Sequence, residues 1–178
     1  MEIRSIKKED YKGYENALTD LYVDTFSSGK SFQYHSKKET KNYLQSIFDL
    51  GYGIFAFENN RLTGALLLTP LTFDGLLPES IAQNFELNSS VYVAEMMVQK
   101  TQQGRGIGKK LLYYFLETVD KQRYRDAFIR VWIENKNAVH LYKKMGFTPC
   151  ASIVQSKLLA DKSGMFDFEK IYLHQKID

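Results

Sequence analysis

The sequence is poor in the features that mark several large classes of protein. Cys150 is the only cysteine among 178 residues, so an internal disulfide framework is excluded. Only 3 prolines occur and 44% of the residues are hydrophobic, a composition unlike that of disordered chains. The chain lacks a run of about 18 apolar residues, which a membrane-spanning helix needs, and residues 1–10 lack the apolar core of a signal peptide. These absences predict a soluble, cytoplasmic protein without a membrane partner, and the length predicts one domain, 1–178.

Charge is unevenly distributed, although the formal net charge is only +3. Residues 1–90 contain 9 basic and 12 acidic side chains, whereas residues 91–178 contain 15 and 9. Four of the C-terminal cations lie beside a glycine-rich turn: Lys100, Arg105, Lys109 and Lys110. As a set they favour a phosphorylated ligand at that turn, whereas ordinary solvated surface accounts for any one of them. A concentrated basic stripe is missing, so we expect no nucleic-acid partner.

Hydrophobic periodicity predicts strands and helices in alternation. Apolar residues recur at helical spacing in three segments, 8–26, 37–50 and 107–122. Ser36 and Glu39 form a capping box before the second helix, and Asn135 is placed to cap a fourth, shorter helix that ends near Gly146. Strands are expected at 2–6, 53–58, 62–70, 91–98, 127–133, 152–158 and 166–177. The fold class is therefore mixed α/β (α+β), with a mostly antiparallel sheet of about seven strands flanked by about four helices.

One glycine-rich segment, Gln103-Gly104-Arg105-Gly106-Ile107-Gly108-Lys109, lies between a buried strand and an amphipathic helix. The first N–H groups of a helix have no intrahelical partners, and glycines let an anion approach them closely. The segment therefore favours a phosphate, with a purely structural turn as the alternative. A nucleoside-triphosphate loop is excluded, because Lys110 stands where Ser or Thr is required. A dinucleotide-binding fold fits poorly, because the G-x-G-x-G spacing lies mid-chain after a hairpin.

Two blocks of the sequence resemble the GNAT superfamily of N-acetyltransferases. In residues 98–108, the acyl-CoA signature Q/R-x-x-G-x-G/A is met by Gln103, Gly106 and Gly108. Residues 135–147, NKNAVHLYKKMGF, are similar to the family's N-x-x-A-x-x-L-Y-x-x-x-G-F segment. One predicted helix and one predicted strand separate the blocks, as in the family. The departures are Lys100, where proline is common, and Gln103, which replaces a frequent arginine.

The resemblance implies an acetyl-CoA-dependent N-acetyltransferase. It also implies a V-shaped gap between a splayed central pair of strands, where a bulge interrupts their pairing. Residues 91–147 would form the acyl-CoA side, 1–90 mainly the acceptor side, and 148–178 the C-terminal strands. The implied cofactor-binding residues fall in three groups. Pantetheine would pair with the backbone of Met96, Met97 and Val98, and Asn135 would bond to the same arm. The pyrophosphate would lie on the N–H groups of the signature loop, which comprises Gln103, Gly104, Arg105, Gly106, Ile107, Gly108 and Lys109.

Direct acetyl transfer requires an amine that has lost its proton. Glu95 interrupts an apolar strand and is our candidate base, with a solvent-side or salt-bridged glutamate as the alternative. The position at which some family members carry a catalytic glutamate is occupied here by Arg130. The resemblance places Tyr142 near the thioester sulfur, where it would protonate the CoA thiolate, and a core tyrosine is the alternative. Cys150 lacks an evident His or Asp partner and is expected to be a buried structural cysteine.

The acceptor is expected to be a primary amine of a small molecule or a protein. We expect its pocket to be built from residues 20–90, whose tyrosines could line it. The three histidines are far apart in the sequence and lack ligand spacing, so no metal is expected. The alternative function is a non-catalytic acyl-CoA-binding regulatory module on the same fold. Dimers are common in this family, so a homodimer stays an open alternative.

Overall fold

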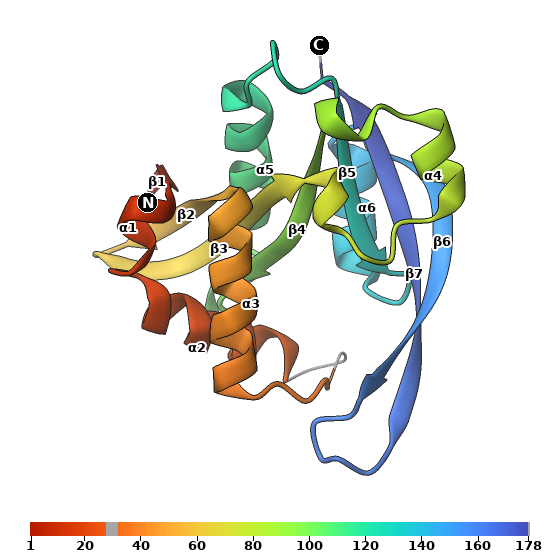
Figure 1. Ribbon diagram of the computed structural model, residues 1–178. Helices are drawn as coiled ribbons and strands as arrows, with labels where there is room; N and C mark the ends of the chain where they lie inside the picture. The colour runs from red at the N-terminus through yellow and green to blue at the C-terminus, as the bar shows by residue number, and fades with distance from the viewer. Residues whose placement is uncertain (28–31, 178) are drawn as a thin grey trace.

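The computed structural model describes residues 1–27 and 32–177, which form one seven-stranded sheet with helices on both faces (Figure 1). The order of the strands is β1 (Glu2–Ile6), β2 (Tyr52–Glu58), β3 (Arg61–Pro70), β4 (Ser90–Val98), β5 (Asp126–Trp132), β7 (Met165–Lys176) and β6 (Thr148–Leu158). Among these strands β4 and β5 pair in parallel, and the other neighbours pair antiparallel. The predicted fold class is therefore confirmed.

Four longer helices pack on the sheet: α2 (Glu15–Phe26), α3 (Lys37–Leu50), α5 (Ile107–Thr118) and α6 (Lys136–Lys144). Two short helices, α1 (Lys8–Tyr11) and α4 (Glu79–Asn84), complete the set in the described residues. The Ser36 hydroxyl accepts the N–H of Glu39 at 3.1 Å and caps α3. The single helix predicted over residues 8–26 is broken between Tyr11 and Glu15, in a stretch that contains Gly13. Helix α5 ends at Thr118, four residues before the predicted end, because Val119 has an extended backbone.

Two apolar layers fix the sheet between the helices, because alternate residues of a strand point to opposite faces. One face of β2 and β3 packs against α5 through Ile54, Ala56, Leu66 and Leu68. The opposite face packs against α2 and α3 through Phe55, Phe57, Ala65 and Leu67. Burying a side chain of this kind contributes roughly 1.5–3 kcal/mol. Both faces of β2 and β3 are therefore stabilised by buried apolar side chains. Among the described residues, none of the helices combines the length and apolarity that crossing a bilayer requires.

The two central strands separate partway along their length. The β4–β5 ladder runs only from the pair Ser90–Asp126 to the pair Val93–Ile129. Further along β4, Leu67 of β3 lies opposite Glu95, whereas Leu68 lies opposite Val93, so Ala94 is the extra residue of a bulge. The splayed central pair is confirmed, but the bulge lies in the pairing of β4 with β3 rather than in that of the two central strands. The backbone of β4 after the bulge thus faces the gap.

Candidate functional site

The glycine-rich loop after β4 presents open backbone at the beginning of α5. Gly104 and Gly106 have φ angles of +77° and +78°, a left-handed conformation that glycine adopts without strain. A methyl group at either position would meet no atom of the described residues within 4 Å. Gly106 is the N-cap of α5 and makes no side-chain cap, so the first N–H groups of the helix stay available to a ligand. The loop therefore has the geometry of an anion site.

The side chains of this loop have specific partners. The Arg105 guanidinium donates to both carboxylate oxygens of Glu58, at 3.0 and 2.9 Å, and also contacts Gln102. Gln103 donates from Nε2 to the carbonyl oxygen of Val98 at 3.2 Å, which ties the loop to the end of β4. Lys109 is exposed on the first turn of α5, and Ile107 is buried beneath it. The positive charge of Arg105 is thus paired with Glu58.

Glycine at position 108 also lets α5 approach its neighbours closely. A methyl group on Gly108 would lie 3.4 Å from both the Leu141 side chain on α6 and the Met96 side chain on β4. At the beginning of α6, the Asn135 side-chain oxygen accepts the N–H of Ala138 at 3.3 Å, as the sequence predicts for an N-cap. Because this oxygen already accepts a helix N–H, the Nδ2 group is the part of the Asn135 side chain that is left to donate a hydrogen bond.

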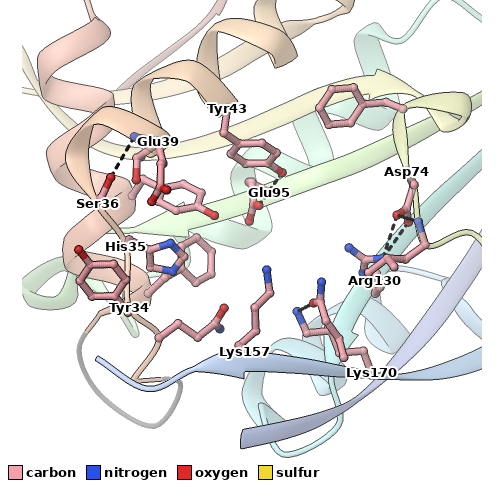
Figure 2. Close-up of a pocket in the computed structure, with 18 of the residues that line it drawn as sticks. Tyr34, His35, Ser36, Glu39, Tyr43, Asp74, Glu95, Arg130, Lys157 and Lys170 are labelled. Carbon is pink, nitrogen blue, oxygen red and sulfur yellow. Dashed lines mark hydrogen bonds and ion pairs between the residues drawn. The ribbon is translucent and has the colours of Figure 1, made fainter. Parts of the chain in front are cut away.

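A cavity of about 370 Å³ lies on the other side of the splayed strands (Figure 2). Six aromatic residues line it: Tyr22, Phe26, Tyr34, Tyr43, Phe73 and Tyr92. The charged side chains in its wall are Glu39, Asp74, Glu95, Arg130, Lys157 and Lys170. Residues 20–90, from which we expect the acceptor pocket to be built, supply only part of the lining of this cavity. The tyrosines do line it, but half of the charged groups come from β5, β6 and β7, which the sheet brings together from distant parts of the chain.

Backbone contacts hold the β6–β7 hairpin as one wall of the cavity. The long hairpin, blue in Figure 1, extends beyond the sheet toward the segment between α2 and α3. The N–H of Tyr34 donates to the carbonyl of Leu158 at 2.9 Å, and the N–H of Ala160 donates to that of Phe32 at 2.7 Å. These hydrogen bonds fix the hairpin opposite α3, so side chains of both elements line the same cavity.

Glu95, the predicted base, lies in the wall of this cavity next to the bulge. The Tyr43 hydroxyl donates to its Oε1 at 2.9 Å. Burial raises the pKa of Glu95 above its ordinary value, against the Tyr43 hydrogen bond and the nearby positive charges, which lower it. No carboxylate–cation pair within 4.0 Å involves Glu95 among residues 1–27 and 32–177, so the salt-bridged alternative does not apply there.

Arg130, at the position where some family members carry a glutamate, belongs to a buried ionic network. Its Nη1 lies 2.8 and 3.1 Å from the two carboxylate oxygens of Asp74, and it donates to the Tyr172 hydroxyl at 2.8 Å. Tyr172 in turn donates to Asp74 at 2.8 Å. Sequence reasoning missed this network, because Asp74 lies in the least periodic part of the chain. The network fixes β5 and β7 to the turn after β3 and leaves Arg130 largely neutralised.

Tyr142 lies in the core and does not line the cavity. Its side chain packs near Phe147 and is only 5% exposed. Burial raises the pKa of Tyr142 far above its usual range, and the negative charge of Glu95 raises it further. The phenol therefore keeps its proton at neutral pH and can act as a donor. Glu95 and Tyr142 are close enough to interact electrostatically.

Cys150 is exposed, so the prediction of a buried cysteine is wrong. Pro149 pairs with Leu173 and Ala151 pairs with Tyr172, which leaves Cys150 as the extra residue of a bulge on the edge strand β6. Its Sγ lies 3.5 Å from the carbonyl oxygen of Tyr172, and partial burial raises the pKa of the thiol. A raised thiol pKa lowers the thiolate fraction, so Cys150 lacks the activation that a nucleophile needs.

Comparison with known proteins extends these observations. Residues 15–147 match the model of the acetyltransferase (GNAT) family. An uncharacterized N-acetyltransferase of Methanocaldococcus jannaschii is 27% identical over 146 residues, which are 82% of this chain but only 59% of that relative. The ribosomal-protein-alanine N-acetyltransferase of Brucella melitensis has a similar structure, with a TM-score of 0.72, 17% identity and 99% of each chain covered. A Salmonella typhimurium protein solved with its cofactor acetyl-CoA gives a TM-score of 0.66 at 16% identity, with 100% of this chain and 94% of that chain covered.

Proposed function

The chain belongs to the acetyltransferase (GNAT) family, and we propose that it transfers the acetyl group of acetyl-CoA directly to a primary amine. The observation that carries the proposal is the position of Glu95. This carboxylate lines the cavity and directly precedes Met96, where β4 begins to face the gap between the central strands. A base in the acceptor cavity would thus adjoin the strand proposed to hold the donor.

The residues on the donor side fit coenzyme A. The open N–H groups from Gly104 to Lys109 suit a diphosphate. The edge of β4 at Met96, Met97 and Val98, which lies beyond the ladder with β5, suits the amides of a pantetheine arm. The Nδ2 group of Asn135 would donate to the same arm. Acetyl-CoA bound there would supply a thioester, which is open to attack by an amine.

On the acceptor side, Glu95 would take the proton that the amine must lose. An alkyl ammonium has a pKa of about 10.4, so freeing its nitrogen at pH 7 costs roughly 4–5 kcal/mol. Because burial raises the pKa of Glu95, its proton affinity lies closer to that of an amine than an exposed carboxylate's does. Desolvation of the amine in the aromatic cavity would lower the remaining cost.

Two further groups would act while the carbon–sulfur bond breaks. The backbone N–H near Met97 would donate to the thioester oxygen as negative charge develops on it. Tyr142, whose phenol is protonated at neutral pH, would give its proton to the departing sulfur, although burial makes it a weaker acid than an exposed tyrosine. The roles of Glu95 and Tyr142 are therefore opposite. The raised pKa of Glu95 favours its role as a base, whereas the raised pKa of Tyr142 keeps the phenol protonated but opposes transfer of its proton.

Two measurements test this function. Calorimetry should detect binding of acetyl-CoA, and release of free thiol should accelerate on addition of a primary amine from a broad panel. Absence of binding would contradict the proposal altogether. Binding with no turnover on any amine would instead favour a non-catalytic acyl-CoA-binding module.

A further inference from the structure

Two lysines of the β6–β7 hairpin face the cavity, and neither lies within 4.0 Å of a carboxylate in the part of the chain that the structure describes. Lys157 lies on β6 and Lys170 on β7, and both line the cavity. Lys170 donates to the side-chain oxygen of Gln155 at 2.7 Å, which holds its ammonium group in the wall. Within residues 1–27 and 32–177, neither lysine forms an ion pair with a carboxylate. In Figure 2 the Lys157 side chain points across the cavity toward Glu95 and Tyr43.

Among the described residues, Lys157 and Lys170 are the cations of the cavity wall that do not form an ion pair within 4.0 Å. The third cation, Arg130, is neutralised by Asp74 at 2.8 Å. Burial and the charges of Arg130 and Lys157 lower the pKa of Lys170 to about 8, against the negative charges of Glu95 and Asp74, which raise it. The two ammonium groups thus repel each other in a partly desolvated place, an arrangement that an anion between them would relieve.

The wall near the lysines also contains an unsatisfied polar atom. His35 Nε2 is buried and has no hydrogen-bond partner among the described residues. Burial and the charges of Lys157 and Lys170 lower the pKa of His35 to about 4, so the ring is neutral at pH 7. A neutral imidazole can still donate one hydrogen bond, and burial of a polar atom without a partner is costly. An acceptor oxygen supplied by a ligand would satisfy it.

We propose that the acceptor in the reaction above is a small amine that also carries a carboxylate, with its nitrogen beside Glu95 and its carboxylate at Lys157 and Lys170. This inference rests on the proposed function. The cavity volume of about 370 Å³ suits a small molecule and not a folded partner. The aromatic wall of Tyr22, Phe26 and Phe73 would cover the apolar carbons between the two charged groups.

The charges balance through the reaction. Glu95 takes one proton from the ammonium group, and the freed nitrogen forms a bond to the acetyl carbon as the carbon–sulfur bond breaks. Tyr142 gives its proton to the thiolate, and the second proton that the nitrogen loses on becoming an amide restores the Tyr142 phenol. Glu95 then releases its proton to solvent. The carboxylate of the acceptor takes no part and keeps its contact with the lysines. The product has lost its positive charge, so its nitrogen no longer attracts Glu95, which favours release of the product.

The first test compares each amino acid with its own carboxamide. A panel of glycine, phenylalanine, 4-aminobutanoate and 6-aminohexanoate varies the length and the apolar part of the acceptor. We expect at least one acid to exceed its amide about tenfold or more in kcat/KM, because the amide lacks the charge that the lysines bind. Amides that equal or exceed their acids throughout the panel would overturn the inference, while their turnover would leave the proposed function intact.

The second test removes the cations one at a time. Lys157→Met and Lys170→Met should each raise the KM for the preferred acid about 10- to 100-fold and leave the KM for acetyl-CoA unchanged. Turnover of the matched amide should stay near that of the wild type, a result that a merely structural role of the lysines would not give. Lys176→Met, on β7 but outside the cavity, is the control and should change neither value.

Lys157→Arg is a conservative control. It keeps the positive charge, so it should keep the preference for the acid over the amide. An unchanged ratio of acid to amide in both methionine variants would overturn the inference. A wild-type protein that binds no acetyl-CoA would instead refute the proposed function. The two failures are therefore distinguishable.

Discussion

The proposed donor and acceptor sides of the gap are built on different principles. On the donor side, a nearly continuous stretch from Met96 to Lys109 presents backbone groups, and its conformation depends on glycines with positive φ angles. On the acceptor side, the cavity is formed by side chains from α2, α3, β4, β5 and the β6–β7 hairpin. A backbone site tolerates most side-chain changes but not a change of backbone conformation. A side-chain site can lose its function with a single polar group.

The largest expected effect is on the acceptor side, at the proposed base. Glu95→Gln keeps the shape of the side chain and the acceptor oxygen for Tyr43, but it removes the group that takes the proton. We expect kcat to fall roughly 10²- to 10⁴-fold, the usual contribution of general-base catalysis. The dissociation constant for acetyl-CoA should not change. Rapid-mixing assays and calorimetry measure the two quantities, and Glu79→Gln on the surface helix α4 is the control.

The same substitution has a thermodynamic signature that separates a base from a structural glutamate. The pKa of Glu95 in the folded protein is raised above its ordinary value of 4.5, so the folded state binds more protons than the unfolded state in this range. Stability therefore declines as the pH rises from the ordinary value through the raised one. Glu95→Gln should raise Tm at pH 7 while it abolishes most activity. In the wild type, kcat/KM should fall as the pH drops through the raised pKa. A lower Tm together with lower activity would contradict this assignment.

The next effect lies between the two sides, at the proposed acid. Tyr142→Phe removes only the hydroxyl, and we expect a fall in kcat of about 10- to 100-fold, toward the low end of acid catalysis. The KM for acetyl-CoA should change much less. Tyr124→Phe is a matched control, since Tyr124 is a tyrosine of the same core that is 6% exposed. An unchanged kcat in the Tyr142 variant would remove this residue from the chemistry.

The contrast between the sides also explains what the sequence could predict. The donor loop is local, so spacing alone located Gly104, Gly106 and the beginning of α5. The acceptor cavity depends on tertiary contacts, such as the hairpin hydrogen bonds that bring Lys157 opposite Glu95. In the cavity wall, Glu95 is predicted as a charge within an apolar strand and the tyrosines of residues 20–90 are predicted as lining, whereas Asp74, Lys157 and Lys170 gave no signal.

The remaining differences have local physical causes. The break before Glu15 lies inside a segment whose apolar period continues across it, so periodicity did not reveal it. The exposure of Cys150 follows from a bulge that shifts the register of an edge strand, and registers of this kind depend on the partner strand. The Asp74–Arg130 pair joins positions 56 residues apart, which no motif links.

A smaller effect is expected on the proposed donor side, where the backbone conformation matters more than any one charged side chain. Gly106→Ala places a side chain in the left-handed region, at a cost of about 1–2 kcal/mol. A methyl group at position 106 meets no described atom within 4 Å, so the substitution adds backbone strain but no steric clash. We expect the dissociation constant for acetyl-CoA to rise about 5- to 30-fold, which is that cost converted at 1.4 kcal/mol per factor of ten. Gly164→Ala, in an open loop without a positive φ, should leave binding unchanged.

The smallest effects test whether charge matters at the donor loop. The Arg105–Glu58 pair is exposed to solvent, so its contribution is largely screened. Glu58→Gln should release Arg105 toward a bound diphosphate and tighten acetyl-CoA binding, whereas Arg105→Gln should weaken it. Each change should be about two- to fivefold and should fade at high salt, as is typical of exposed charges. Titrations at two ionic strengths measure both. Changes as large as that of Gly106→Ala would show that side chains, and not the backbone, dominate the donor side, and the contrast between the two sides would fail.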